Sequence, residues 1–134
     1  MAKQGVGAKY DAGKLRVGLL LNGLAYELEE IAAVLTYGGE KYAAHSWQNV
    51  PEGRERYFDA LGRHLLEISK GHVLDDESGL RHVAHMACDL LFIMYLDRHA
   101  LKEEMGDFVD GVAFEKWLLT YNPPPAAPKK RARK

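Results

Sequence analysis

Two segments of the chain carry imidazole and carboxylate side chains at the spacing of one helix face. In the first, His64 and Glu67 lie about 60° apart if the segment is helical. In the second, His82, His85 and Asp89 follow an i, i+3, i+7 pattern and fall within about 60° of arc. Facing helices that present such groups build divalent-metal sites, in which polyphosphate supplies further oxygen ligands.

The same residue types also fit plainer roles. They could form buried ion pairs, or they could line a polar interface between copies of the chain. Glu27 and Glu30 lie one turn apart in an earlier segment, and they too allow two interpretations. Glu30 either completes a metal shell or belongs to an exposed acidic face.

Several familiar catalytic motifs are excluded. Residues 7–15 resemble a phosphate-binding loop, but five residues separate the glycines and Leu15 stands where Ser or Thr would bind magnesium. The chain contains neither a His-Asp dipeptide nor a His-Glu-x-x-His motif, which counts against two classes of metallohydrolase. The single cysteine, Cys88, excludes a thiolate-rich zinc site and an intramolecular disulfide, so a cytoplasmic setting is expected.

Apolar residues recur at spacings of three and four through most of the chain, which predicts an all-α fold of three to four packed helices. Paired glycines predict a helix end near residues 37–39. No apolar stretch approaches the ~20 residues of a membrane span. Residues 1–19 are expected to form an extended arm, and the expected helices cover residues 24–37, 51–71, 79–100 and 110–121, with a short helical piece at 40–45.

Charge is unevenly distributed along the 134 residues. Five basic residues lie in the last six positions, behind a proline-rich stretch, so residues 1–128 carry a net charge of −6. An acidic body argues against a large nucleic-acid interface. The chain therefore divides into an expected folded domain at residues 1–121 and a basic tail at 122–134, whose contact with nucleic acid would be weak.

Several motifs in order resemble the MazG-like, all-α nucleoside triphosphate pyrophosphohydrolases. Glu67 and Asp89 match their carboxylate signature, whereas Arg63, His64 and Met86 depart from it. The similarity is greater to the phage branch of dATP/dGTP diphosphohydrolases, which includes the MazZ-type enzymes. The motifs that carry it are Lys9 to Lys14, Tyr37-Gly38, Lys41-Tyr42, Trp47, Tyr57, Asp59-Ala60, Arg63-His64, Asp75, Glu77-Ser78-Gly79, His82 and Ala84-His85.

The resemblance implies metal-dependent cleavage of a purine (deoxy)nucleoside triphosphate, with dGTP foremost, to the monophosphate and pyrophosphate. The reaction would either supply dGMP or remove unwanted nucleotides from the phage nucleotide pool. Two or more Mg²⁺ or Mn²⁺ ions would be expected. The residues implied in catalysis are Glu67, Asp89, His64 and His85, and the metal ligands are expected among these four, Asp75, Glu77 and Glu30. His82 is implied as a further replacement for the missing acids, either as a ligand or as a residue that orients one.

Substrate contacts are expected from basic and aromatic side chains. Phosphate oxygens call for guanidinium and ammonium groups, and a base can stack on an aromatic ring. Asp11 is a candidate to read the base or sugar. The other candidates are Lys9, Lys14, Arg16, Lys41, Trp47, Arg63 and Arg81.

Other interpretations stay open. A non-catalytic nucleotide- or metal-binding module with a DNA-docking tail fits the departures from the carboxylate signature. A third interpretation is a related pyrophosphohydrolase that prefers a pyrimidine dNTP such as dUTP or dCTP, because selectivity depends on a few pocket contacts that helical periodicity does not locate. Helices with one polar face rarely bury enough surface alone, and the resemblance implies assembly, so a homodimer or homotetramer is expected.

Overall fold

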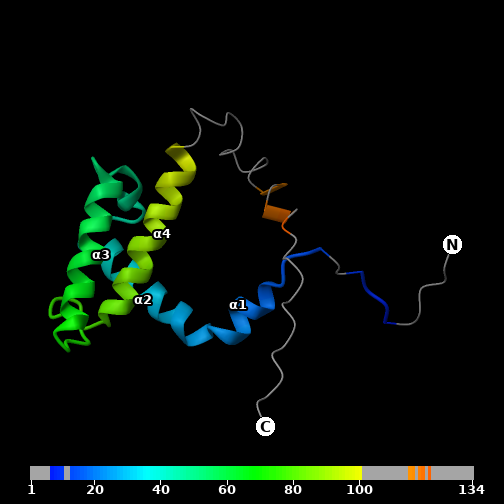
Figure 1. Ribbon diagram of the computed structural model, residues 1–134, viewed down its shortest axis with the longest axis horizontal. Helices are drawn as coiled ribbons and strands as arrows, with labels where there is room; N and C mark the ends of the chain where they lie inside the picture. Colours follow the sequence, from blue (N-terminus) through cyan, green and yellow to red (C-terminus); the bar gives the residue numbers. More distant parts are fainter. Residues whose placement is uncertain (1–6, 11–12, 101–114, 117, 120, 122–134) are drawn as a thin grey trace, which may run out of the picture.

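The computed structural model describes residues 7–10, 13–100, 115–116, 118–119 and 121. The predicted all-α class is confirmed for these residues, which form four helices and one 3-10 turn. Figure 1 shows α3 and α4 side by side, with α2 crossing behind them and α1 leading away. The elements are α1 (Val17–Gly23), α2 (Ala25–Lys41), η1 (Ser46–Asn49), α3 (Gly53–Ser69) and α4 (His82–Ala100).

Aromatic residues join η1 and α3 to the second half of α4. The Trp47 ring stacks on Phe92 with ring centroids 4.4 Å apart and meets the edge of Tyr95 at 4.8 Å. The Tyr57 hydroxyl donates a hydrogen bond of 2.9 Å to the Trp47 carbonyl. Gly53 allows α3 to start close to α4, because a Cβ there would lie 3.2 Å from the Leu96 side chain. These contacts fix the two long helices against each other.

A small apolar core joins α2 to the first half of α4. Val34, Ala84 and Cys88 are buried, and Ile31, Leu80 and Phe92 pack around them. The Cys88 thiol is 1% exposed and donates a weak hydrogen bond to the Ile31 carbonyl, with Sγ 3.7 Å from the oxygen. α2 is therefore held to α4 at the end that carries the histidines.

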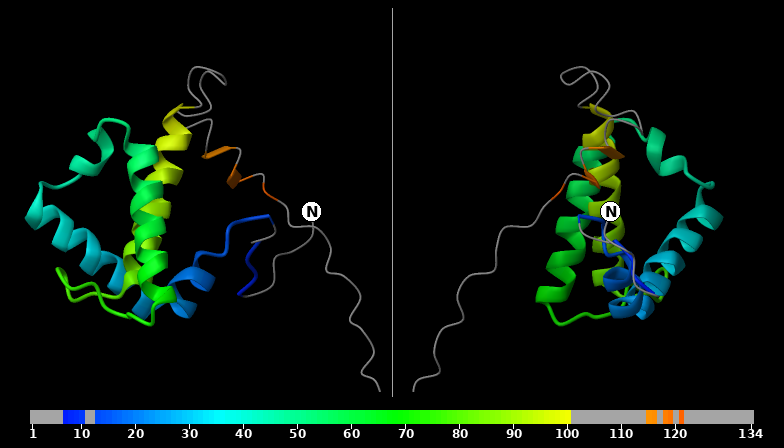
Figure 2. Two further views of the ribbon diagram at one scale, coloured as in Figure 1. Left: turned by 60° about the vertical axis from the view of Figure 1, so that its left-hand side comes forward. Right: turned by 90° about the vertical axis from the view of Figure 1, so that its right-hand side faces the viewer.

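The connection between α3 and α4 is closed by backbone hydrogen bonds. Leu74 and Arg81 form an antiparallel bridge. The Asp75 amide donates to the Leu80 carbonyl at 2.8 Å, and the His82 amide donates to the Val73 carbonyl at 2.9 Å. Gly79 takes a positive φ of 73° inside the turn, a conformation that glycine adopts without strain. The loop runs back beside the end of α3 before α4 begins (Figure 2).

Several predicted element boundaries are wrong. Part of the expected N-terminal arm is α1, and α2 continues through Gly38 and Gly39 to Lys41. Glycine weakens a helix interior by ~1 kcal/mol without ending it, and here the Gly38 carbonyl still accepts a hydrogen bond from Tyr42. No separate helix forms at residues 40–45. The last long helix begins at His82 and not at Gly79, because the preceding residues belong to the bridged loop.

The predicted helix at 110–121 and the tail at 122–134 lie largely or wholly outside the described residues, although residues 115, 116, 118 and 119 are helical. None of the helices in the described ranges is long and apolar enough to cross a membrane.

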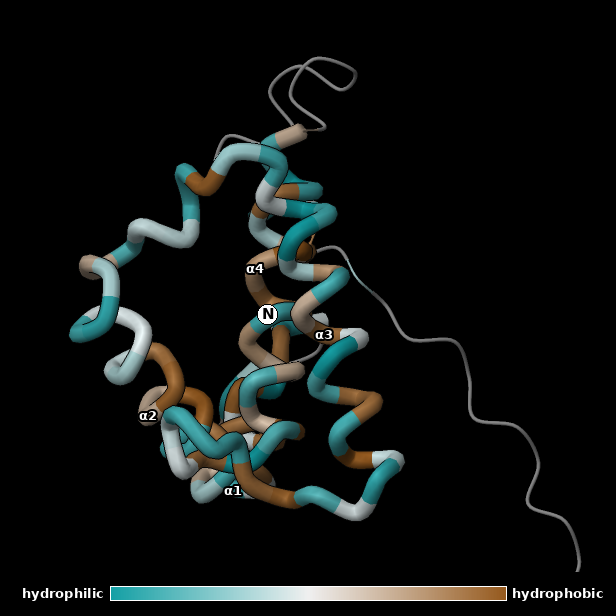
Figure 3. The backbone as a smooth tube through the Cα atoms, turned by 90° about the vertical axis from the view of Figure 1, so that its left-hand side faces the viewer, coloured by the Kyte–Doolittle hydropathy of each residue, from teal (hydrophilic) through white to brown (hydrophobic). Residues whose placement is uncertain are grey.

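Large apolar side chains remain exposed on α1 and on the outer faces of α3 and α4. α1 buries none of its residues, although its sequence is mostly apolar. In Figure 3 apolar and polar residues alternate along the tube of α3. On α4, Leu90 and Met94 are 51% and 66% exposed. The other exposed residues of this kind include Val17, Leu19, Leu20, Leu21, Leu24, Phe58, Leu65, Leu66, Val83 and Leu91.

Candidate metal centre

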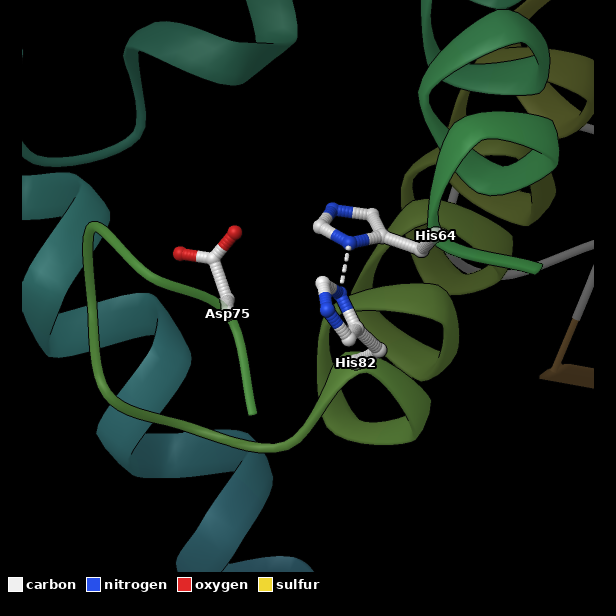
Figure 4. Close-up of side chains that lie close together, drawn as sticks. All are labelled: His64, Asp75 and His82. Carbon is white, nitrogen blue, oxygen red and sulfur yellow. Dashed lines mark hydrogen bonds between the residues drawn. The ribbon is translucent and has the colours of Figure 1, made fainter. Parts of the chain in front are cut away.

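Three potential metal ligands from three different segments converge beside the first turn of α4. His64 comes from α3, Asp75 from the bridged loop and His82 from the start of α4. One ligand atom of each lies within 4.8 Å of the others. Figure 4 shows the two imidazoles facing each other, with the Asp75 carboxylate beside them. The Nδ1 atoms of His64 and His82 are 2.8 Å apart.

The backbone of the loop places two of these ligands. The bridge brings Asp75 and His82 together although seven positions separate them in the sequence. The His82 side chain is 5% exposed. A buried imidazole needs polar partners, and here the described partner is the ring nitrogen of His64.

Ser78 and His85 hold the surrounding groups in position. The Ser78 amide donates to Asp75 Oδ2 at 2.8 Å, and Ser78 Oγ lies 2.7 Å from His85 Nε2. The His85 ring stacks on His64 with centroids 4.8 Å apart and a 12° angle between planes. His85 Nε2 is 3.9 Å from Asp75 Oδ2. His85 thus lies next to the three ligands and contacts two of them.

The local electrostatics favour the protonation states that bind metals. Burial lowers the pKa of His64, and the neighbouring His85 and His82 add to this effect. Burial also lowers the pKa of His85, against the opposing influence of Asp75. Burial alone would raise the pKa of Asp75, but hydrogen bonds from the Ser78 backbone and side chain outweigh this effect and lower the pKa below its ordinary value. Neutral imidazoles and an ionised carboxylate are the forms that act as ligands.

Two carboxylates expected at a metal site are engaged with basic groups instead. Glu67 pairs with His72 at 2.6 Å and with Lys70 at 2.9 Å, and these hydrogen bonds lower its pKa to about 2. Glu30 accepts two hydrogen bonds of 2.6 Å from the Arg81 guanidinium. Neither residue belongs to the group formed by His64, Asp75 and His82.

Glu77 pairs with Lys41 at the edge of the same region. The Lys41 ammonium also lies 5.1 Å from the Tyr42 ring centroid and 5.9 Å from that of Tyr37. The hydrogen bond to Glu77, with that to Tyr42, raises the pKa of Lys41. Tyr37 meets the His85 ring edge-on at 6.2 Å, so this cation and its aromatic neighbours border the group formed by His64, Asp75 and His82.

Asp89 lies further along α4, away from the three-ligand group. Its side chain is buried, and its Oδ2 atom has no hydrogen-bond partner within the part of the chain that the structure describes. Burial raises the pKa of Asp89 to about 7, although Arg63 acts in the opposite direction. Asp89 is therefore a buried acid whose pKa is about 7.

The other predicted substrate contacts are dispersed. The half-buried Trp47 packs against Phe92 and Tyr95 on α4, and its contact with a base stays a prediction. Lys9, Lys14 and Arg16 are exposed and precede α1. Arg63 is exposed on α3, next to His64. Asp11 lies outside the described residues.

Sequence reasoning gave no site role to Ser78 or Tyr37, although both stand in motifs that carry the resemblance. The spacing of Ser78 three residues after Asp75 is the usual signal for a side-chain turn. In the structure this turn lies before α4, and the hydrogen bond from the Ser78 amide orients the Asp75 carboxylate.

Comparisons with known proteins agree with the resemblance found in the sequence. Residues 4–108 match the family described as dATP/dGTP diphosphohydrolase, N-terminal. A protein of Salmonella phage PMBT28 named dATP/dGTP diphosphohydrolase is 42% identical over 90 residues. These residues make up 67% of this chain but 29% of that relative, so the chain spans about three tenths of its length. No solved structure matches. Because the family match covers most of the chain, the chain belongs to the dATP/dGTP diphosphohydrolase, N-terminal family.

Proposed function

We propose that this chain acts in the metal-dependent hydrolysis of a purine deoxynucleoside triphosphate, with dGTP as the preferred substrate. The products would be the nucleoside monophosphate and pyrophosphate. The family match over residues 4–108 carries this proposal, together with the name of the phage relative. The cluster of His64, Asp75 and His82 supports it, because it offers a possible site for a divalent ion.

The groups around the cluster suit a polyphosphate ligand. A bound divalent ion would neutralise phosphate charge and lower the pKa of a coordinated water. Arg63 is exposed beside His64 and is available to contact phosphate oxygens. Lys41 would do so after exchanging its carboxylate partner Glu77 for phosphate. His85 would position the His64 ring by stacking.

A site made of carboxylates alone fits these residues less well. Glu67 and Glu30 would each have to leave basic partners before they could bind an ion. The donors that lie together are two imidazoles and one carboxylate. We therefore assign the ion to His64, Asp75 and His82, while roles for Glu67 and Asp89 in catalysis remain predictions.

A second candidate function follows from the length of the phage relative. The aligned region is 29% of that protein. A domain of this size could bind nucleotide or metal while the chemistry takes place in another part of a longer enzyme. This function predicts nucleotide binding without turnover.

We also propose that the chain assembles into a homodimer or homotetramer. α1 buries no residue, and α4 exposes Leu90 and Met94 on the side away from the core. Exposed apolar side chains in this number favour an interface between copies of the chain. Light scattering at several concentrations tests this, and a monomer at all of them would contradict it.

The test of the reaction is a product assay with the purified chain. Each of the common dNTPs is incubated with and without Mn²⁺ or Mg²⁺, and products are separated by chromatography. We expect metal-dependent release of dGMP and pyrophosphate from dGTP. His64→Ala and Asp75→Asn should remove the activity, whereas His99→Ala, at the far end of α4, should keep it.

Each alternative has its own result. Binding of dGTP without cleavage would support the binding module. Cleavage of dUTP or dCTP in preference to dGTP would support pyrimidine selectivity. Cleavage that survives in both His64→Ala and Asp75→Asn would contradict the assignment of the site.

A further inference from the structure

The ligand atoms gathered at the candidate metal centre are mostly nitrogen. Two come from imidazoles, the Nδ1 atoms of His64 and His82, and the third comes from the Asp75 carboxylate. We propose that this cluster binds one first-row transition-metal ion per chain, in preference to Mg²⁺. This inference rests on the proposed function in that both concern the same site. It is a statement about metal binding and not about turnover of a nucleotide.

Donor chemistry is the first argument. Mg²⁺ requires oxygen ligands in a nearly octahedral arrangement and binds imidazole poorly. Imidazole suits the later divalent ions, for which the affinity of such sites generally increases along the series from Mn²⁺ to Cu²⁺. Two imidazoles and one carboxylate also leave positions open for water or a phosphate oxygen.

The state of the nearby acids is the second argument. An oxygen-only site would need Glu67, Glu30 or Glu77, but each is paired with a basic side chain. Freeing any of them for Mg²⁺ would leave a cation without its partner. The His64, Asp75 and His82 donors require no such exchange, because none of them pairs with a lysine or arginine among the interactions of the described residues.

The third argument is the arrangement of the two imidazoles. Their Nδ1 atoms face each other at 2.8 Å, and the His82 ring is 5% exposed. Two ring nitrogens satisfy each other only when one carries a hydrogen and the other does not. A metal ion can instead accept a lone pair from both. A buried pair of facing donors beside a carboxylate is thus suited to share a cation.

Neighbouring groups hold the donors ready. Ser78 fixes one oxygen of Asp75 through its amide, and its hydroxyl contacts His85, which stacks on His64. Such outer contacts orient the ligands and commonly change metal affinity by about 10–100-fold when removed. Ser78 and His85 are therefore positioning residues for the centre.

The experiment uses Co²⁺ as a probe, because its visible absorption reports the ligands directly. The chelator-treated chain is titrated with CoCl₂, and a large excess of MgCl₂ is then added. We expect one Co²⁺ per chain, with absorption bands of an ion that has nitrogen ligands, and no displacement by Mg²⁺. Circular dichroism on every variant verifies that it is folded.

The variants separate the ligands from their surroundings. His64→Ala and Asp75→Asn should each weaken Co²⁺ binding by about 100-fold or more, and Ser78→Ala by about 10-fold. Glu67→Gln and His99→Ala are matched controls that should bind as the original chain does. His82→Ala should also lose binding, and His64→Ala serves in its place if removal of the buried ring unfolds the chain.

Three results would overturn the inference. These are no binding of Co²⁺, displacement of Co²⁺ by the added MgCl₂, or unchanged Co²⁺ binding in both His64→Ala and Asp75→Asn. Failure of the proposed function is distinguishable from these. A chain that binds Co²⁺ at the cluster but cleaves no dNTP contradicts the function alone, whereas cleavage without Co²⁺ binding contradicts this inference alone.

Discussion

Two regions of the molecule differ in the partners of their side chains. One is the bridged loop together with α3 and α4, and the other is α1. Around the loop, polar groups from α3, α4 and residues 71–81 bond to one another over 2.6 to 2.8 Å, and His82 is buried. In α1, by contrast, apolar side chains are exposed and none is buried. The first region holds its chemistry within one chain, whereas α1 requires another surface before it can contribute stability.

The largest expected effect comes from a matched pair of apolar truncations. Ile93 on α4 is 8% exposed, while Leu21 on α1 is 54% exposed. Ile93→Ala should lower the free energy of unfolding by about 2–5 kcal/mol, because it removes buried methyl groups and leaves a cavity. Leu21→Ala should cost less than about 0.5 kcal/mol in the monomer. Urea unfolding of both variants at low protein concentration measures the difference, and equal losses would show that α1 is packed as tightly as α4.

The second effect is a pH dependence from Asp89. The pKa of this group is about 7 when folded, against 3.8 as the ordinary value, because it is buried. The folded chain therefore holds a proton that the unfolded chain releases, and stability falls as pH rises from about 4 to 7. Between pH 5 and pH 8 this loss amounts to about 2–3 kcal/mol.

Asp89→Asn should remove that loss. The lowered pKa values of His64 and His85 act in the opposite direction, but both proteins share them, so the difference between the two unfolding curves isolates Asp89. We expect the variant to gain stability relative to the original chain as pH rises. A difference that stays constant between pH 5 and pH 8 would contradict the assignment of a buried, protonated acid.

A smaller effect is expected from the ion pair that ties α2 to the start of α4. Arg81→Lys keeps the charge but loses the two-pronged contact with Glu30. The melting temperature should fall by a few degrees at most, because exposed pairs contribute little and are screened by salt. Thermal melts at low and high salt measure this. If Arg81 contacts phosphate instead, the variant should raise KM for dGTP with little change in stability.

The smallest effect on the stability of the monomer is expected from Leu20→Ser combined with Leu21→Ser. Both side chains are exposed on α1. The monomer should keep its stability to within about 0.5 kcal/mol, but self-association should be lost if α1 forms the interface. Light scattering measures the mass, and a variant that assembles as before would place the interface elsewhere, for example on the exposed face of α4.

The sequence predicted the fold class and part of the site for identifiable physical reasons. Helical periodicity places His82 and His85 on one face, and in the structure His82 belongs to the cluster while His85 borders it. Asp89 shares that face, but it lies two turns beyond His82, and its side chain is buried there. Periodicity reports the direction of a side chain and not its depth along the helix axis.

Contacts between segments could not be predicted from spacing alone. Glu67 had the expected carboxylate, but Lys70 and His72 lie close enough to capture it. Asp75 reaches the histidines only because the Leu74 and Arg81 bridge folds the loop back, and it entered the expected site solely through the family resemblance. The end of α2 was missed because two glycines weaken a helix without stopping it.

The buried thiol of Cys88 is a natural probe for the separation of α2 from α4. Its sulfur is shielded between α4 and the Ile31 carbonyl of α2, and burial raises its pKa to about 11. Alkylating reagents react with the thiolate, so modification must wait until α2 separates from α4. The rate at which Cys88 is alkylated therefore reports how often α2 separates from α4. A ligand that holds these two helices together will lower this rate.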